Sequence, residues 1–173
     1  MAVSGSKNFE LDVTEYIEEA FERCGREVRT GYDIKTAKRS MNLLFADWAN
    51  RGLNSWTIEQ STQALTAGTA NYTLNADTID ILSAAVRRDN VDYNIQRLSR
   101  DDYLGVPNKT TQGRPSQWFL DRLISPVLKL WPVPENSTDV IVFDRLVRMD
   151  DADTAQNTVE MPFRFYPCLA AGL

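Results

Sequence analysis

The 173-residue sequence contains no histidine and only two cysteines. Without histidine, the chain cannot form Ser-His-Asp or Cys-His catalytic arrangements, bind zinc through imidazole, or use that side chain as a proton shuttle. Cys24 and Cys168 each fall on an apolar helical stripe. This position predicts buried free thiols in a reducing compartment.

Long apolar runs are also missing from the sequence. No stretch approaches the ~18 apolar residues of a membrane span. The opening residues, MAVSGSKNF, lack the apolar stretch of a signal peptide. We therefore expect no membrane partner, and synthesis and assembly in the cytoplasm. The net charge of -5 argues against a dedicated nucleic-acid binder, because such proteins usually present a basic surface.

No segment has the pattern of a catalytic or cofactor site. The stretch TAGTANYT lacks the lysine of a phosphate-binding loop, and no serine occupies a G-x-S-x-G turn. Three adjacent acidic pairs (18–19, 101–102 and 150–151) fall on a solvated helix face, in a capped turn and in a loop. A catalytic acid and base must instead face each other across a substrate. We predict a chain that is not an enzyme, with no cofactor and no metal.

Two amphipathic helices open the chain. Asp12 and Glu15 have the spacing of a capping box, and an apolar stripe follows at three- and four-residue steps until Gly25, formed by Val13, Tyr16, Ile17, Ala20, Phe21 and Cys24. Asp33 is the expected cap of a second helix, which ends at Arg51-Gly52. Its apolar side is lined by Ile34, Ala37, Met41, Leu44, Phe45 and Trp48.

After Gly52 the apolar residues alternate, which predicts strands in WTIEQSTQAL and ANYTL. The clearest hairpin has Asp89-Asn90 in a two-residue turn. This register places Arg87 opposite Asp92 as a cross-strand ion pair. It also places four apolar side chains on the other face, namely Ala84, Val86, Tyr93 and Ile95. Ser99 and Asp102 predict a short capped helical turn.

Three further strands are predicted in SQWFLDRL, PVLKLWPVP and TDVIVFDRLV, followed by an acidic loop and a helical end, VEMPFRFYPCLAAGL. The acidic stretch 150–160 approaches a calcium loop but lacks its central glycine, so a solvated linker is favoured. The last helix has neither a cap nor a polar tail, and we expect the chain to continue past Leu173.

The predicted fold class is α+β, with a discontinuous helical bundle built from the N- and C-terminal helices and an inserted antiparallel, sandwich-like β-rich domain. The expected domains are residues 1–54 plus 158–173 for the helical module and residues 55–157 for the β-rich domain.

Seven side chains are candidates for an interface, namely Lys35, Lys38, Arg39, Lys109, Arg114, Trp118 and Trp131. The three cations of the second helix form either a solvated face or a contact with an acidic partner. The four tryptophans are either core or interface residues or a stacking platform for sugars or bases, namely Trp48, Trp56, Trp118 and Trp131. Arg114, Arg122 and Lys129 lie near them in the sequence, and Trp118 and Trp131 are the pair expected to form a binding site. The alternative to a structural role is therefore a β-sandwich module, braced by helices, that binds a carbohydrate or a receptor.

The order of segments resembles the head-to-tail adaptor (connector) proteins of tailed bacteriophages, including the tail tubular protein A and tail accessory factor relatives of short-tailed phages. The resemblance covers nearly the whole chain. It is carried by AFERCG, LLFADWANRGLNSW, ALTAGTANYTLNADTIDILSAAVRR, GRPSQWFLDRLISPVLKLWPVP and MPFRFYPCLAAGL. These motifs are structural and not catalytic.

The resemblance implies a homo-oligomeric ring, commonly of twelve subunits, at the head-tail junction of the virion. In such a ring the portal protein lies above, a tail or nozzle protein lies below, and genomic DNA passes through the channel without sequence-specific binding. An acidic channel wall would repel the DNA phosphates. We therefore expect more carboxylates than basic groups along the channel.

Overall fold

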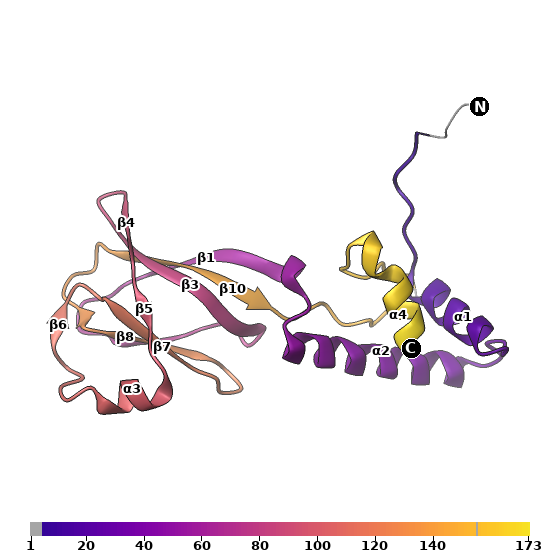
Figure 1. The fold of residues 1–173 in the computed structure, drawn as a ribbon, viewed down its shortest axis with the longest axis horizontal. Coiled ribbons are helices and arrows are strands. Elements are labelled where there is room, and N and C mark those ends of the chain that lie inside the picture. Colours follow the sequence, from indigo (N-terminus) through magenta and orange to yellow (C-terminus); the bar gives the residue numbers. More distant parts are fainter. Residues whose placement is uncertain (1–4, 155) are drawn as a thin grey trace. The chain divides into compact units, whose positions relative to one another are not determined.

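The computed structural model describes residues 5–154 and 156–173, and the chain divides into two compact units (Figure 1). The helical unit contains Met1–Trp56 and Met149–Leu173, and the β unit contains Thr57–Arg148. Helices and mainly antiparallel strands gathered in separate units confirm the predicted α+β class. The assignment of these units as two separate domains stays a prediction.

Helix α1 spans Val13–Arg23 and begins at the predicted capping box. The Asp12 carboxylate accepts a hydrogen bond from the Glu15 backbone N–H at 2.8 Å, and the Glu15 carboxylate accepts one from the Asp12 N–H at 2.9 Å. The first four residues of the predicted stripe are buried, namely Val13, Tyr16, Ile17 and Ala20. A cap contributes about 1 kcal/mol, so burial of this stripe is the larger contribution to stability.

Helix α2 spans Gly31–Arg51 and begins before the predicted cap. Thr30 is the N-cap, and Asp33 is the third helical residue of a reciprocal capping box. The Thr30 hydroxyl accepts from the Asp33 N–H, and the Asp33 carboxylate accepts from the Thr30 N–H at 3.1 Å. The prediction that Asp33 is the N-cap was wrong, because its carboxylate accepts the Thr30 N–H from within the first turn of the helix. Gly52, at φ 66°, ends the helix in the left-handed conformation.

The C-terminal helix α4, Tyr166–Gly172, packs with α1 and α2 in one apolar core. Its Leu169 is fully buried together with Tyr16, Ile17 and Met41. Segment 149–157 belongs to this unit, although the sequence placed it in the β-rich domain. Buried Met149 and Ala152 hold it there, since the Ala152 N–H donates to the Asn42 side-chain oxygen at 2.8 Å.

The prediction of buried thiols is wrong, because Cys24 and Cys168 are both exposed. Helix α1 ends at Arg23, so Cys24 is a cap residue beyond the buried stripe. In α4 the buried residues are Leu169 and Ala170, and Cys168 lies outside that short apolar face. Cys24 is therefore exposed because α1 ends before it, and Cys168 is exposed because it lies inside α4 but off its buried face.

The β unit contains two four-stranded sheets, and its topology is not sequential. One sheet has the order β1-β10-β3-β4, formed by Ile58–Ala64, Val140–Val147, Thr78–Arg88 and Val91–Asn94. The other has the order β2-β8-β7-β5, formed by Asn71–Thr73, Val127–Trp131, Gln117–Asp121 and Gln96–Arg97. Strand β5 is parallel to β7. A short parallel pair joins β6 (Gln112–Gly113) to β9 (Val133–Pro134).

The β3–β4 hairpin has the predicted register, with Val86 paired to Tyr93 and Arg87 paired to Asp92. Both turn residues are left-handed, with φ 52° at Asp89 and 62° at Asn90, as a type I′ turn requires. The guanidinium Nε of Arg87 lies 2.6 Å from the Asp92 carboxylate. The expected ion pair is therefore confirmed.

The core of the β unit lies between the two sheets, as in a sandwich, because each sheet contributes buried side chains to a single cluster. The largest of these is Trp118, which is 1% exposed. The cluster also contains Leu65, Tyr72, Ile81, Ala84, Val86, Ile95, Leu120, Leu128, Leu130, Ile141 and Phe143. The short helix α3, Arg100–Gly105, begins at the predicted Ser99–Asp102 capping box.

Candidate interaction surfaces

The described residues offer neither a metal cluster nor a membrane segment. Within residues 5–154 and 156–173, no three His, Cys, Asp or Glu side chains are placed to share a metal ion. Among the helices of that same part, none has the length and apolar character needed to cross a bilayer.

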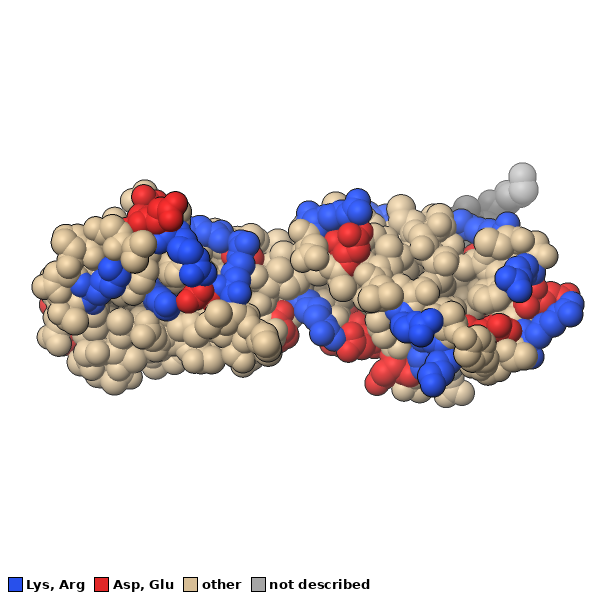
Figure 2. All heavy atoms as spheres, turned by 90° about the horizontal axis from the view of Figure 1, so that it is seen from below, with Lys and Arg blue, Asp and Glu red and all other residues tan. Residues whose placement is uncertain are grey.

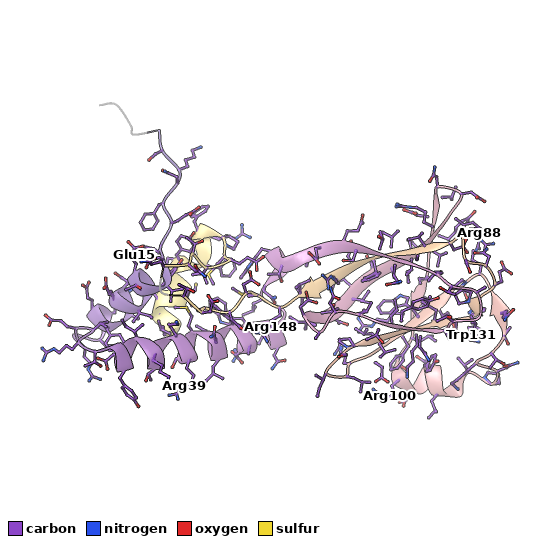
Figure 3. All side chains as sticks on the ribbon, turned by 180° about the vertical axis from the view of Figure 1, so that it is seen from behind. Glu15, Arg39, Arg88, Arg100, Trp131 and Arg148 are labelled. Atoms are coloured by element: carbon purple, nitrogen blue, oxygen red, sulfur yellow. The ribbon has the colours of Figure 1, made fainter. Side chains whose placement is uncertain are left out.

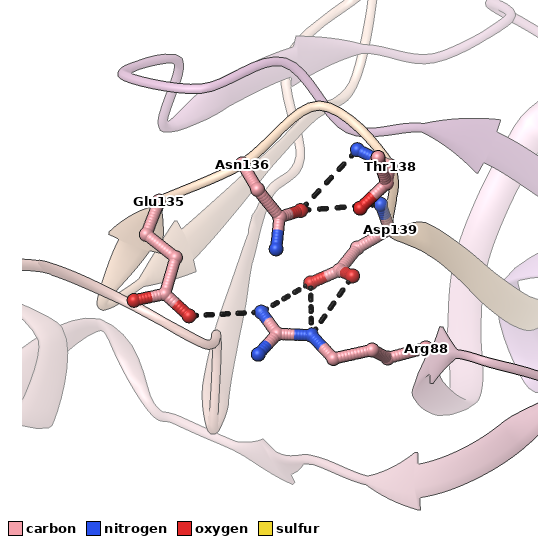
Figure 4. Close-up of polar contacts among 5 residues, drawn as sticks. All are labelled: Arg88, Glu135, Asn136, Thr138 and Asp139. Carbon is pink, nitrogen blue, oxygen red and sulfur yellow. Dashed lines mark hydrogen bonds and ion pairs between the residues drawn. The ribbon is translucent and has the colours of Figure 1, made fainter.

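A carboxylate-arginine network joins the β3–β4 hairpin to the loop that precedes β10 (Figure 4). The Arg88 guanidinium contacts the Asp139 carboxylate through Nε at 2.9 Å and Nη2 at 2.7 Å, and Nη2 also reaches Glu135 at 2.9 Å. The hydrogen bonds to Asp139 and then to Glu135 raise the pKa of Arg88. Asp139 is only 2% exposed, so its pairing with Arg88 fixes the loop against the hairpin.

A second network forms a basic surface on the β unit, where Lys and Arg side chains gather on the face seen in Figure 2. Asp80 accepts from Arg97 at 2.9 Å and from Arg122 at 2.6 Å. Asp121 accepts from Arg100 at 2.7 Å and from Lys129 at 3.0 Å. Four cations share two carboxylates, so these six side chains together carry a net positive charge although the whole chain is acidic.

Aromatic rings lie beneath these cations. The Arg97 guanidinium lies 5.2 Å from the centre of the Trp118 ring, and that of Arg100 lies 5.4 Å from the centre of Phe119. Phe119 stacks on Tyr103 of α3 at 5.2 Å. A groove of about 260 Å³ opens here between Arg97, Arg100, Arg122 and Phe119. We call it the basic groove.

The stability of this surface should depend on pH through Asp121. The Lys129 ammonium and then the Arg100 guanidinium hold the pKa of the Asp121 carboxyl below its usual value. Because the pKa of Asp121 is lower in the folded state, its carboxylate stabilises the fold fully above the unfolded-state pKa of about 3.9. This stabilisation is lost as the pH falls through the folded-state pKa. Lys129→Met should therefore reduce the loss of stability between pH 5 and pH 2.

Urea unfolding at each pH measures this dependence. Lys109→Met is the matched control, because the Lys109 ammonium donates to the carbonyls of Leu104 and Val106 and contacts no carboxylate in the described structure. The control should keep the wild-type pH profile. An unchanged profile in Lys129→Met would contradict the assignment.

The candidates of the β unit are not gathered into one site. Trp118 lies in the core, so its ring cannot stack on a sugar or a base. Trp131 is half-buried, and its indole N–H donates to the Asn108 carbonyl at 2.9 Å. Arg114 lies 4.0 Å above the Tyr93 ring. The carbohydrate alternative therefore loses the shared tryptophan platform on which it rested.

The candidates of α2 differ in exposure. Lys35 and Arg39 are exposed, whereas Lys38 is half-buried and its ammonium donates to the Asp153 carbonyl. Sequence reasoning missed Arg97 and Arg100, because their carboxylate partners Asp80 and Asp121 lie 17 and 21 residues away in the chain. No local spacing marks such a cluster. A role for any of these residues in an interface stays a prediction.

Comparison with known proteins gives one family. The sequence model of the SU10 adaptor protein family matches residues 12–173, which covers α1 to α4 and both units. No protein with a curated description matches the chain. The match confirms the expected kinship with phage adaptors at the level of the family, and the narrower tail tubular type stays a prediction. The chain therefore belongs to the SU10 adaptor protein family, which implies a phage structural adaptor protein of the virion.

Proposed function

We propose that the chain forms a homo-oligomeric ring, of twelve subunits as in the adaptors that it resembles, at the head-tail junction of a phage particle. The portal protein binds above the ring, and a tail or nozzle protein binds below it. The family match over residues 12–173 carries this proposal. Assembly takes place in the host cytoplasm.

Exposed apolar side chains on both units support an assembled state. A stable interface buries roughly 1,200–2,000 Å², which requires more than isolated polar contacts. The described residues present large exposed apolar side chains on helices and loops, among them Phe9, Tyr32, Leu43, Leu104, Leu123, Ile124 and Phe163. Contacts with neighbouring subunits and with the portal or tail would remove them from water.

The channel of the ring serves DNA passage without sequence-specific binding. The chain carries 24 acidic and 19 basic side chains, so its average field repels phosphates. We expect the channel wall to carry more carboxylates than Lys and Arg, so that the genome slides along it. The basic groove of the β unit should then face away from the channel.

The test is assembly with the cognate portal. The purified chain, mixed with the portal protein of the same phage, should give ring-shaped particles by electron microscopy, with a fixed number of copies per portal. A map of such particles should show an acidic lumen. Failure to bind the portal, with the chain a monomer throughout, would overturn the proposal.

A further inference from the structure

Helix α1 presents an acidic side to solvent. Four glutamates recur at three- and four-residue steps on the side opposite the buried stripe, namely Glu15, Glu18, Glu19 and Glu22. Glu19 already pairs with Arg23 at 2.7 Å, and Glu15 accepts the Asp12 N–H. Glu18 and Glu22 are the exposed carboxylates that another molecule can reach.

These glutamates border an open groove with apolar walls. The groove has a volume of about 400 Å³ and lies between α1, α4 and the segment that precedes α1. Its apolar residues are Phe9, Leu11, Tyr166, Pro167 and Ala170, of which Phe9 is 69% exposed. We call this surface the acidic groove. An apolar floor with a charged rim suits an amphipathic segment of opposite charge.

Helix α2 carries a surface of the opposite kind. Along its exposed side, Tyr32, Lys35, Arg39 and Leu43 follow one another at steps of three and four residues, so they form one stripe. Tyr32 is 74% exposed and Leu43 is 66% exposed. We call these four residues the α2 stripe. It combines two positive charges with two large apolar side chains.

The two surfaces lie on opposite sides of the helical unit. Figure 3 shows Glu15 on one side of this unit and Arg39 on the other. Helix α2 buries Ala37, Met41 and Phe45 in the core that it shares with α1 and α4, so the α2 stripe faces outward. One copy therefore cannot join its own groove to its own stripe. Complementary surfaces on opposite sides give a head-to-tail contact, which closes into a ring when the rotation allows.

We propose that the acidic groove of one copy binds the α2 stripe of the next copy in the ring. In this contact Leu43 enters the apolar floor, and Lys35 and Arg39 lie against Glu18 and Glu22. The occupant is a second copy because the stripe, on the same chain, supplies the charge and apolar spacing that the groove lacks. This inference rests on the proposed ring, and it adds which surfaces join.

Charge reversal tests the contact. One variant carries Glu18→Lys with Glu22→Lys, and the other carries Lys35→Glu with Arg39→Glu. Each variant alone should need a roughly tenfold higher protein concentration to assemble, because like charges then face each other. An equal mixture should assemble as the wild type does, since the reversed groove of the first variant meets the reversed stripe of the second, and the unchanged groove of the second meets the unchanged stripe of the first.

Mass photometry across a concentration series, with and without portal, counts the copies. Asp101→Lys, an exposed reversal on α3 of the β unit, is the control and should leave assembly unchanged. Recovery in the mixture also shows that both variants are folded. Leu43→Asn tests the apolar part of the contact without a charge change and should weaken assembly in the same assay.

The outcomes separate this inference from the proposed function. If the wild type forms rings and both reversed variants form them equally well, the groove-stripe contact is overturned and the ring stands. The same conclusion follows if the mixture fails to recover while each variant has a wild-type near-ultraviolet circular dichroism spectrum. If the wild type remains a monomer with and without portal, the proposed function itself fails.

Discussion

Trp118→Ala should lower the free energy of unfolding by about 3–5 kcal/mol, the range for removing a buried aromatic side chain from a core. The Trp118 side chain is 1% exposed and lies between the two sheets of the β unit. Its neighbours belong to strands far apart in sequence and cannot collapse freely into the cavity. Guanidinium unfolding followed by far-ultraviolet circular dichroism measures the change.

The matched control is Trp131→Ala, because the Trp131 ring is half-buried and donates a single hydrogen bond to the Asn108 carbonyl. Trp131→Ala should lower the free energy of unfolding by clearly less than Trp118→Ala does. The comparison also addresses the carbohydrate alternative. If a glycan array detected binding that Trp118→Ala abolished without loss of stability, Trp118 would be a ligand residue and its place in the core would be wrong.

Arg88→Met should lower the midpoint of thermal unfolding of the β unit by on the order of 10 °C. The substitution leaves the Asp139 carboxylate, 2% exposed, without its bidentate partner. An unpaired buried charge is costly, so the loss should greatly exceed that of an exposed pair. Arg87→Met is the control, because its partner Asp92 is about half exposed, and it should lower the midpoint of thermal unfolding only slightly.

A double variant separates pairing from packing. In Arg88→Met with Asp139→Leu, neither charge remains, and apolar side chains of similar size fill the site. Most of the lost stability should return, because two apolar partners replace a buried pair at little cost. Differential scanning calorimetry gives all four midpoints of the cycle. A double variant no more stable than Arg88→Met alone would show that the loop, and not the ion pair, is the sensitive element.

Strand β7 shows why the sequence could not decide between core and ligand roles for tryptophan. Both of its faces are covered, with Trp118 and Leu120 in the sandwich core and Phe119 under Tyr103 of α3. A strand buried on both faces has no alternation that marks the inner side. The ring of Trp118 is inaccessible because the opposing sheet and the Arg97 side chain cover it, and the sequence of β7 does not encode those distant contacts.

The sequence by itself determined the local structure of this protein. The capping boxes at Asp12 and Ser99 and the type I′ hairpin at Asp89-Asn90 depend on residues within a few positions of one another, so their spacing is visible in the chain. The apolar stripes of α1 and α2 follow from the helical period in the same way. The lack of histidine excluded whole classes of catalytic site before any fold was known.

Only the tertiary structure decided which distant segments meet. Strand β10 lies between β1 and β3, Asp139 pairs with Arg88 across 51 positions, and Met149 and Ala152 pack in the core of the helical unit. Such pairings depend on how apolar faces pack together after the chain has turned back on itself, and no periodicity records that choice. The opposite positions of the acidic groove and the α2 stripe have the same origin, because packing of α1 and α4 on α2 sets which sides remain exposed.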